Sequence, residues 1–199
     1  MCISTTKCSK TVLPDAKKNS ETGFLRLLLP LALWLACGSA DGQTLTVLRN
    51  LGMSDGYTPY GNLILTGNVL YGTSLSGGSA GKGSVFKINT DGSGYTLLKN
   101  FDSAGPNSPM GRPVLSGGTL YGSTLTDGTD AASRGAVFKI NTDGSGYTVL
   151  KHFASTNGAG PHGGLTLSGA TLYGTTYYGG VWDLGTVFKK HRRNGIPGP

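Results

Sequence analysis

The residues of this sequence best suited to bind a metal ion stand in a string that occurs twice, VFKINTDGSGYT, at 85–96 and 137–148. In each copy an asparagine, an aspartate and a serine alternate along the chain and offer side-chain oxygens, the ligands that calcium takes. They are Asn89, Asp91 and Ser93, and Asn141, Asp143 and Ser145. Each copy offers a single carboxylate and has glycines suited to a hairpin turn. We therefore interpret the string as a turn and keep calcium, the one cofactor considered, as the alternative.

A second set of carboxylates stands in the string DGTD, where Asp127 and Asp130 lie three residues apart. Such a pair could hold a cation or act as acid and base, but the other repeats lack it, so we interpret it as a solvated loop. A carbohydrate-active hydrolase or lyase is the alternative function, and glycoside cleavage would need two converging carboxylates. Residues 41–199 contain no glutamate. The candidates are Asp55, Asp102, Asp127, Asp130 and Asp183.

Two further arrangements are poor candidates for catalysis. The string GGSAG places Ser79 in a formal G-x-S-x-G motif, but that motif needs a turn from a strand into a helix, and no helix is expected here. The three histidines, His152, His162 and His191, have no metal-ligand spacing. We predict no catalytic residue and favour a protein that is not an enzyme.

Aromatic residues offer the preferred contact surface. Tyr177, Tyr178 and Trp182 stand in the string YYGGVWDLG, between two expected strands, where aromatic rings with polar edges could stack on sugars or contact a protein. The alternative is that these aromatic side chains pack at the protein surface and bind no ligand. By contrast, the tyrosines in the recurring LYG strings are expected to pack within the fold. They are Tyr71, Tyr121 and Tyr173.

These residues belong to tandem repeats of 50 to 52 residues, about 52–101, 102–153 and 154–190. Each repeat has up to four short strand-like segments separated by glycine, asparagine or aspartate turns. Four antiparallel strands per repeat predict an all-β, β-propeller-like domain over residues 41–190. A β-solenoid and a β-sandwich remain alternatives.

The number of strands raises the question of how the array ends. The third repeat lacks a fourth strand, whereas LTVLRNL at 45–51 aligns with the fourth strands YTLLKNF and YTVLKHF. Three arrangements stay open. The orphan strand 45–51 closes a ring, two chains exchange terminal strands in a six-bladed homodimer, or the chain is a truncated remnant left as an open arc.

The first 40 residues resemble a secretory signal peptide. Basic residues precede the apolar run LLLPLALWLAC at 27–37, which is too short to span a membrane, and cleavage is expected after Ala40. A lipoprotein signal acylated at Cys37, and a start downstream of Met1, are alternatives. All three cysteines lie in this segment. We expect an exported protein with no membrane span in its mature chain.

Removal of this segment also lowers the charge. Residues 41–199 contain 12 Lys plus Arg and 8 Asp, a net +4, and four of the positive charges lie at 189–193, around the start of a basic, Pro/Gly-containing tail at 191–199. The body is thus nearly neutral and has no basic face to follow phosphates, so we expect no nucleic-acid partner.

The strings GGLTLSGATLYGTTYYGG, GTVFKKH and GAVFKINTDGSGYTVLKHF resemble the GloVer tandem repeat of bacterial exported proteins. The resemblance covers nearly all of residues 45–189 and implies a secreted or surface-attached protein of unassigned molecular role. Its anchoring tail is not matched, since residues 196–199 form no apolar helix. We therefore expect an exported, non-catalytic binding or structural module whose partner is a polysaccharide or a surface protein.

Overall fold

The computed structural model describes residues 44–127 and 134–192. The expected signal peptide and Asp130 lie outside these ranges, as does the tail from residue 193 onward. The chain divides into two units between Thr44 and Leu45, and the fold below is that of the second. Within the described ranges no helix is long and apolar enough to cross a membrane.

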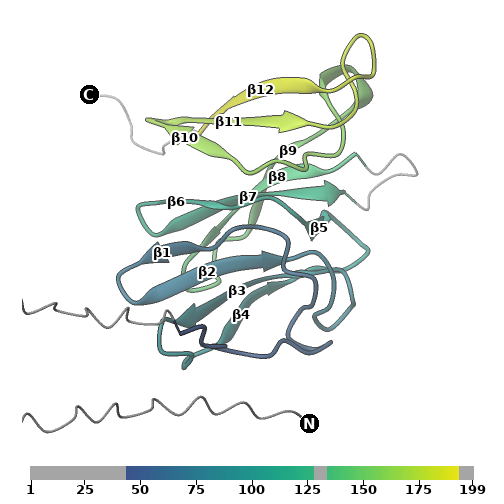
Figure 1. Cartoon of the computed structure of the whole chain (residues 1–199). Helices are drawn as coiled ribbons and strands as arrows, with labels where there is room; N and C mark the ends of the chain where they lie inside the picture. Colours follow the sequence, from purple (N-terminus) through teal and green to yellow (C-terminus); the bar gives the residue numbers. More distant parts are fainter. Residues whose placement is uncertain (1–43, 128–133, 193–199) are drawn as a thin grey trace, which may run out of the picture. The chain divides into compact units, whose positions relative to one another are not determined.

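The described part of the chain contains twelve strands in three antiparallel sheets and one short 3₁₀ turn, which confirms the all-β prediction. The three sheets follow one another along the chain (Figure 1). The first contains β1 (Ile64–Thr66), β2 (Val69–Ser74), β3 (Ser84–Asn89) and β4 (Thr96–Asn100). The second contains β5 (Asn107–Pro109), β6 (Val114–Ser116), β7 (Thr119–Thr126), β8 (Ala136–Asn141) and β9 (Thr148–His152). The third contains β10 (Thr166–Ser168), β11 (Thr171–Thr176) and β12 (Thr186–His191), and the turn η1 (Ser155–Asn157) precedes it.

The repeats in the sequence are repeats of one sheet. Two-residue turns at 67–68, 117–118 and 169–170 join β1 to β2, β6 to β7 and β10 to β11. The duplicated string forms β3 and β8, a turn, and the start of the following strand. In both copies the register shifts between the valine and the phenylalanine of VFK. Strand β12 ends at His191, one residue beyond the expected end of the domain.

The strings LYG and VFK face each other across neighbouring strands. The glycine of one is paired with the phenylalanine of the other in every sheet, and the pairs are Gly72 with Phe86, Gly122 with Phe138, and Gly174 with Phe188. A Cβ atom on Gly122 would lie only 2.5 Å from Cζ of Phe138. The ring therefore needs the space that glycine leaves, which explains why the two strings recur together.

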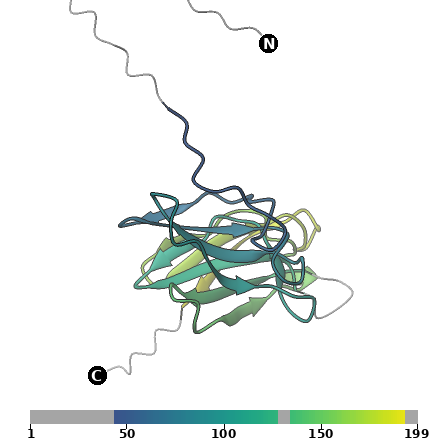
Figure 2. The same ribbon diagram turned by 90° about the horizontal axis from the view of Figure 1, so that it is seen from below.

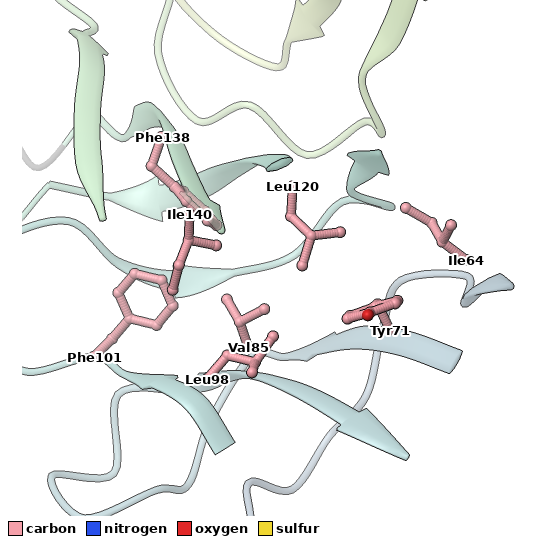
Figure 3. Close-up of a cluster of buried hydrophobic side chains, with 8 residues drawn as sticks. All are labelled: Ile64, Tyr71, Val85, Leu98, Phe101, Leu120, Phe138 and Ile140. Atoms are coloured by element: carbon pink, nitrogen blue, oxygen red, sulfur yellow. The ribbon is translucent and has the colours of Figure 1, made fainter. Parts of the chain in front are cut away.

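Apolar side chains from both faces of the second sheet pack against its neighbours. Val85 and Leu98 of the first sheet point toward Leu120 and Ile140 of the second (Figure 3). Phe101 meets Phe138 edge to face, with ring centroids 5.5 Å apart. A second cluster joins the other face of this sheet to the third sheet and contains Tyr121, Val137, Phe153, Leu165 and Leu172.

The same backbone hydrogen bonds accompany both of these contacts. The amide of Ser108 donates to the carbonyl of Lys82, and the amide of Gly160 donates to that of Arg134, both at 2.8 Å. Next to these bonds and within the preceding sheet, the amide of Phe101 donates to the carbonyl of Gly83 at 3.0 Å, and that of its counterpart Phe153 donates to Gly135 at 2.9 Å. We call this combined apolar and hydrogen-bonded contact the junction, and the described structure contains two copies of it.

Residues 45–51 do not form the expected fourth strand of the third sheet. They have no strand pairing within the described structure, and the third sheet contains three strands. The segment lies against the first sheet, on the side away from the second (Figures 1 and 2). There the guanidinium of Arg49 lies 4.1 Å from the centroid of the Tyr95 ring. Ring closure within one chain is therefore not seen in the described residues.

The fit of phenylalanine over glycine predicts the effect of one added methyl group. The substitution Gly122→Ala forces Cβ against the Phe138 ring, which is 1% exposed and has no room to move aside. We expect a loss of about 1–3 kcal/mol in the free energy of unfolding, measured by urea denaturation. Gly105→Ala is the control, because its Cβ would meet nothing within 4 Å. Equal stability of the two variants would contradict this explanation.

Candidate binding surface

The loop between β11 and β12, residues 177–185, concentrates exposed apolar side chains. Trp182 is 81% exposed and Tyr177 and Tyr178 are more than half exposed, as the sequence suggested. The same loop exposes Val181 and Leu184. The aligned residues 75–83 of the first repeat expose no large apolar side chain. Exposed apolar patches can mark contacts with other molecules, so this loop is a candidate contact surface.

Three aromatic rings of this surface contact one another. The rings of Tyr177 and Tyr178 meet edge to face with centroids 4.5 Å apart. On its other side Tyr177 meets the imidazole of His162, at 5.0 Å and an interplanar angle of 68°. The loop and the segment before β10 thus hold each other in place. We call His162, Tyr177, Tyr178 and Trp182 the aromatic patch.

The aromatic patch adjoins a groove in which the three repeats meet. The first strand of each hairpin, β1, β6 and β10, contributes to one polar-edged groove. A smaller neighbouring groove of about 200 Å³ is lined by Tyr60, Asn62, Arg112 and His162. His162 therefore belongs to both the aromatic patch and the smaller groove. The exposed Arg112 also lines the smaller groove and adds a positive charge and five hydrogen-bond donors.

The turns that were candidates for calcium are closed by their own hydrogen bonds. Oδ1 of Asp91 accepts from the amide and the hydroxyl of Ser93, at 2.8 and 2.7 Å. The hydroxyl bond, followed by the amide bond, lowers the pKa of this carboxyl. Nδ2 of Asn89 donates to Oγ of the same serine at 2.9 Å. The second copy, Asn141 to Ser145, repeats these bonds. An ion would compete with bonds already made.

The remaining aspartates lie in separate local contacts. Asp55 forms an ion pair with Arg49 at 2.8 Å, and the carboxylates of Asp102 and Asp183 accept from nearby backbone amides. Asp127 is buried, with Oδ2 3.6 Å from Nδ1 of His152. No group of three metal-binding side chains gathers among the residues that the structure describes. Ser79 contributes its amide to Oδ1 of Asn100 at 3.3 Å, so the G-x-S-x-G string forms part of a loop.

The sequence matches the model of one protein family. The family described as the Gloeobacter/Verrucomicrobia repeat matches residues 38–195. The chain belongs to this family. The GloVer resemblance is thereby confirmed.

The chain was also compared with curated proteins and with solved structures. No curated protein matches the sequence. Among solved structures, a chain of a crystal structure titled "Crystal structure of Nidogen/Laminin Complex" is similar, with 21% identity and a TM-score of 0.44. The match covers 62% of this chain and 40% of that one.

Sequence reasoning missed two residues of this surface, His162 and Arg112. The histidines were considered only as metal ligands or catalytic groups. An available signal was the repeat register: Tyr60, Met110 and His162 all occupy the second position of a P-x-G string, just before the first strand of each repeat. All three line the small groove.

Calcium titration tests the turn interpretation. We expect calcium up to about 10 mM, above the dissociation constants of extracellular calcium modules, to leave the melting temperature unchanged. A ligand raises the melting temperature only if it binds the folded protein. The paired variant Asp91→Asn/Asp143→Asn is the control. A rise in melting temperature with calcium that this variant abolishes would show that the turns are calcium sites.

Proposed function

We propose that this chain is an exported, non-catalytic repeat module that binds a polysaccharide through the aromatic patch. The observation that carries the proposal is the contact of His162 with Tyr177 and of Tyr177 with Tyr178, on a loop that also exposes Trp182. Flat, exposed rings suit the apolar faces of sugars, while the hydroxyl groups and Arg112 supply hydrogen bonds at the edges. A repeat family fits a role in which a rigid scaffold carries a variable loop.

The scaffold in this proposal is propeller-like, with each sheet as one blade. Two features support it: the sheets are antiparallel and follow one another in chain order, and their first strands line a common groove. In a propeller the first strands lie nearest the central axis. The patch would then stand at one end of that axis, at the mouth of the groove, where a long sugar chain has access.

The carbohydrate-active enzyme is less well supported than the binding module. Its candidates Asp55, Asp102 and Asp183 make an ion pair or accept backbone hydrogen bonds nearby, and these structural roles are sufficient to explain why aspartates stand at these positions. Asp91 and Asp143 lie in equivalent turns of two different sheets. A glycosidase of the usual kind needs two carboxylates directed at one bond.

Export rests on the sequence pattern of the first 40 residues. If they act as a secretory signal, the protein recovered outside a bacterial host begins near Asp41, which terminal sequencing or intact mass measures. A lipoprotein would instead begin at an acylated Cys37. A protein retained in the cytoplasm with its basic segment intact would contradict export.

Binding to polysaccharide is tested by substitution within the patch. We expect a glycan array of bacterial and plant polysaccharides to yield a ligand, and Tyr177→Ala/Trp182→Ala to weaken its binding by at least about tenfold, because central aromatic residues dominate contact energies. Titration calorimetry with the array ligand measures this change. Met53→Ala removes an 82% exposed apolar residue of the first repeat and is the matched control. Absence of any ligand, or unchanged binding by the double variant, would contradict the proposal.

A further inference from the structure

The outer face of the third sheet exposes residues that are buried in the other two sheets. Val187 is 83% exposed, although Val85 and Val137 at the same position of VFK are 1% and 0% exposed. Tyr173 is 40% exposed, whereas its counterparts Tyr71 and Tyr121 are 6% and 7% exposed. In the first two sheets these side chains face the junction with the next sheet. The third sheet thus presents half of a junction without the other half.

The outer face of the first sheet presents the complementary half. It contains a groove of about 330 Å³ lined by Leu70, Phe86 and Ile88. Their counterparts in the second sheet, Leu120, Phe138 and Ile140, form the surface on which Val85 packs. The groove is therefore the place that a valine of a preceding VFK string would fill.

Three prolines at one repeat position also differ in burial between the first sheet and the other two. Pro109 and Pro161 are fully buried. The Cδ atom of each lies 2.7 Å from the place of a Cβ on Gly83 or Gly135 of the preceding sheet, so no side chain fits there. Pro59 is exposed, because the described structure has no sheet before the first. The glycine that would meet it by analogy is Gly185.

The residue before each proline has an unusual backbone conformation. Thr58, Ser108 and Gly160 have φ angles of 60°, 57° and 59°. For Ser108 and Gly160 this conformation directs the amide to a carbonyl of the preceding sheet, the junction bond described above. Thr58 adopts it although it is β-branched, for which positive φ is costly, and its amide has no acceptor in the described part of the chain. The corresponding acceptor would be the carbonyl of Leu184.

Residues 45–51 lie on the first sheet as β4 lies on the second. The carbonyl oxygen of Leu48 is 2.8 Å from the place of a Cβ on Gly92, and that of Leu98 is 3.0 Å from the equivalent place on Gly144. Arg49 covers the ring of Tyr95, as Lys99 covers that of Tyr147 with its Nζ 4.8 Å from the centroid. The segment thus has the position of a fourth strand whose own sheet is missing.

We propose that a second copy of this chain supplies that sheet. The third sheet of each copy docks on the first sheet of the other, and residues 45–51 pair with the free edge of β12 as its fourth strand. By analogy with β3 and β4 the pairs are Asn50 with Thr186, Arg49 with Val187, Val47 with Phe188, and Thr46 with Lys189. The contact is the same on both copies, as in a two-fold dimer. It closes both open faces and both open edges.

The dimer contains six sheets, within the four to eight blades of known propellers. It rests on the blade arrangement proposed above but does not require a polysaccharide. It also leaves Trp182 of the aromatic patch exposed. Ser79, Ala80 and Lys82 align with Val181, Trp182 and Leu184, and they stay exposed although the first sheet has a neighbour.

The oligomeric state of the full chain tests the proposal. Light scattering during size-exclusion chromatography is expected to give a mass twice the 20.5 kDa of one chain. Val187→Asp places a charge in the apolar groove and is expected to reduce the mass to that of one chain. Val181→Asp changes a valine that is 89% exposed and lies outside the contact, so this matched control stays dimeric. A monomeric wild type, or a dimer that persists in Val187→Asp with an unchanged circular dichroism spectrum, overturns the proposal.

A disulfide tests the strand exchange itself. In a chain with Cys2, Cys8 and Cys37 replaced by serine, Arg49→Cys and Val187→Cys occupy facing positions in the proposed pairing. Oxidation is expected to produce a covalent dimer on a non-reducing gel, and neither single variant forms it to a comparable extent. A disulfide within one chain, or no disulfide in the double variant, overturns the exchange. A monomeric wild type that still binds polysaccharide would contradict the dimer alone and leave the proposed binding role intact.

Discussion

Burial of apolar side chains between neighbouring sheets is the interaction on which the described structure depends. Val137 and Phe138 are adjacent in β8 and point to opposite faces of the second sheet, one toward the third sheet and one toward the first. Neither face can be left in water without losing the free energy gained by burying a valine or a phenylalanine. A sheet of this kind needs a neighbour on each side. This need explains the repeats, and it applies equally to the two sheets at the ends of the array.

The junction combines buried apolar side chains with backbone hydrogen bonds, and these bonds do not depend on which side chains the loops carry. Its hydrogen bonds join amides and carbonyls, and glycine opposite phenylalanine keeps each sheet thin at the centre. Only the end of the loop between β2 and β3, at Lys82 and Gly83, takes part in this contact, and Ser79 and Ala80 in the middle of the loop stay exposed. The third repeat can therefore carry tyrosine and tryptophan where the first carries serine and alanine. A fixed scaffold with one variable loop is an arrangement suited to binding, because the scaffold holds the loop ends.

Much of this fold could be predicted from the sequence, because the repeat period and turn residues are local signals. The order of the repeated strands, the two-residue turns and the loop positions of Tyr177, Tyr178 and Trp182 follow from them. The short strand β5 was not predicted. The position of residues 45–51 could not be predicted. Their amino-acid sequence matches that of a fourth strand. Which sheet they touch, however, depends on contacts with Gly92 and Tyr95, more than forty residues away in the chain. The contact between His162 and Tyr177 was missed for the same reason, since only the fold brings β10 and the loop before β12 together.

The most direct measurement is amide hydrogen exchange at Thr58, followed by nuclear magnetic resonance. Ser108 and Gly160 donate their amides across the two junctions of the described structure and should be protected in any case. If the open faces form a third junction of the same kind, the amide of Thr58 is protected to a similar degree at concentrations where the protein is dimeric. An amide of Thr58 that exchanges at the rate of a free amide, while the other two stay protected, would contradict the account.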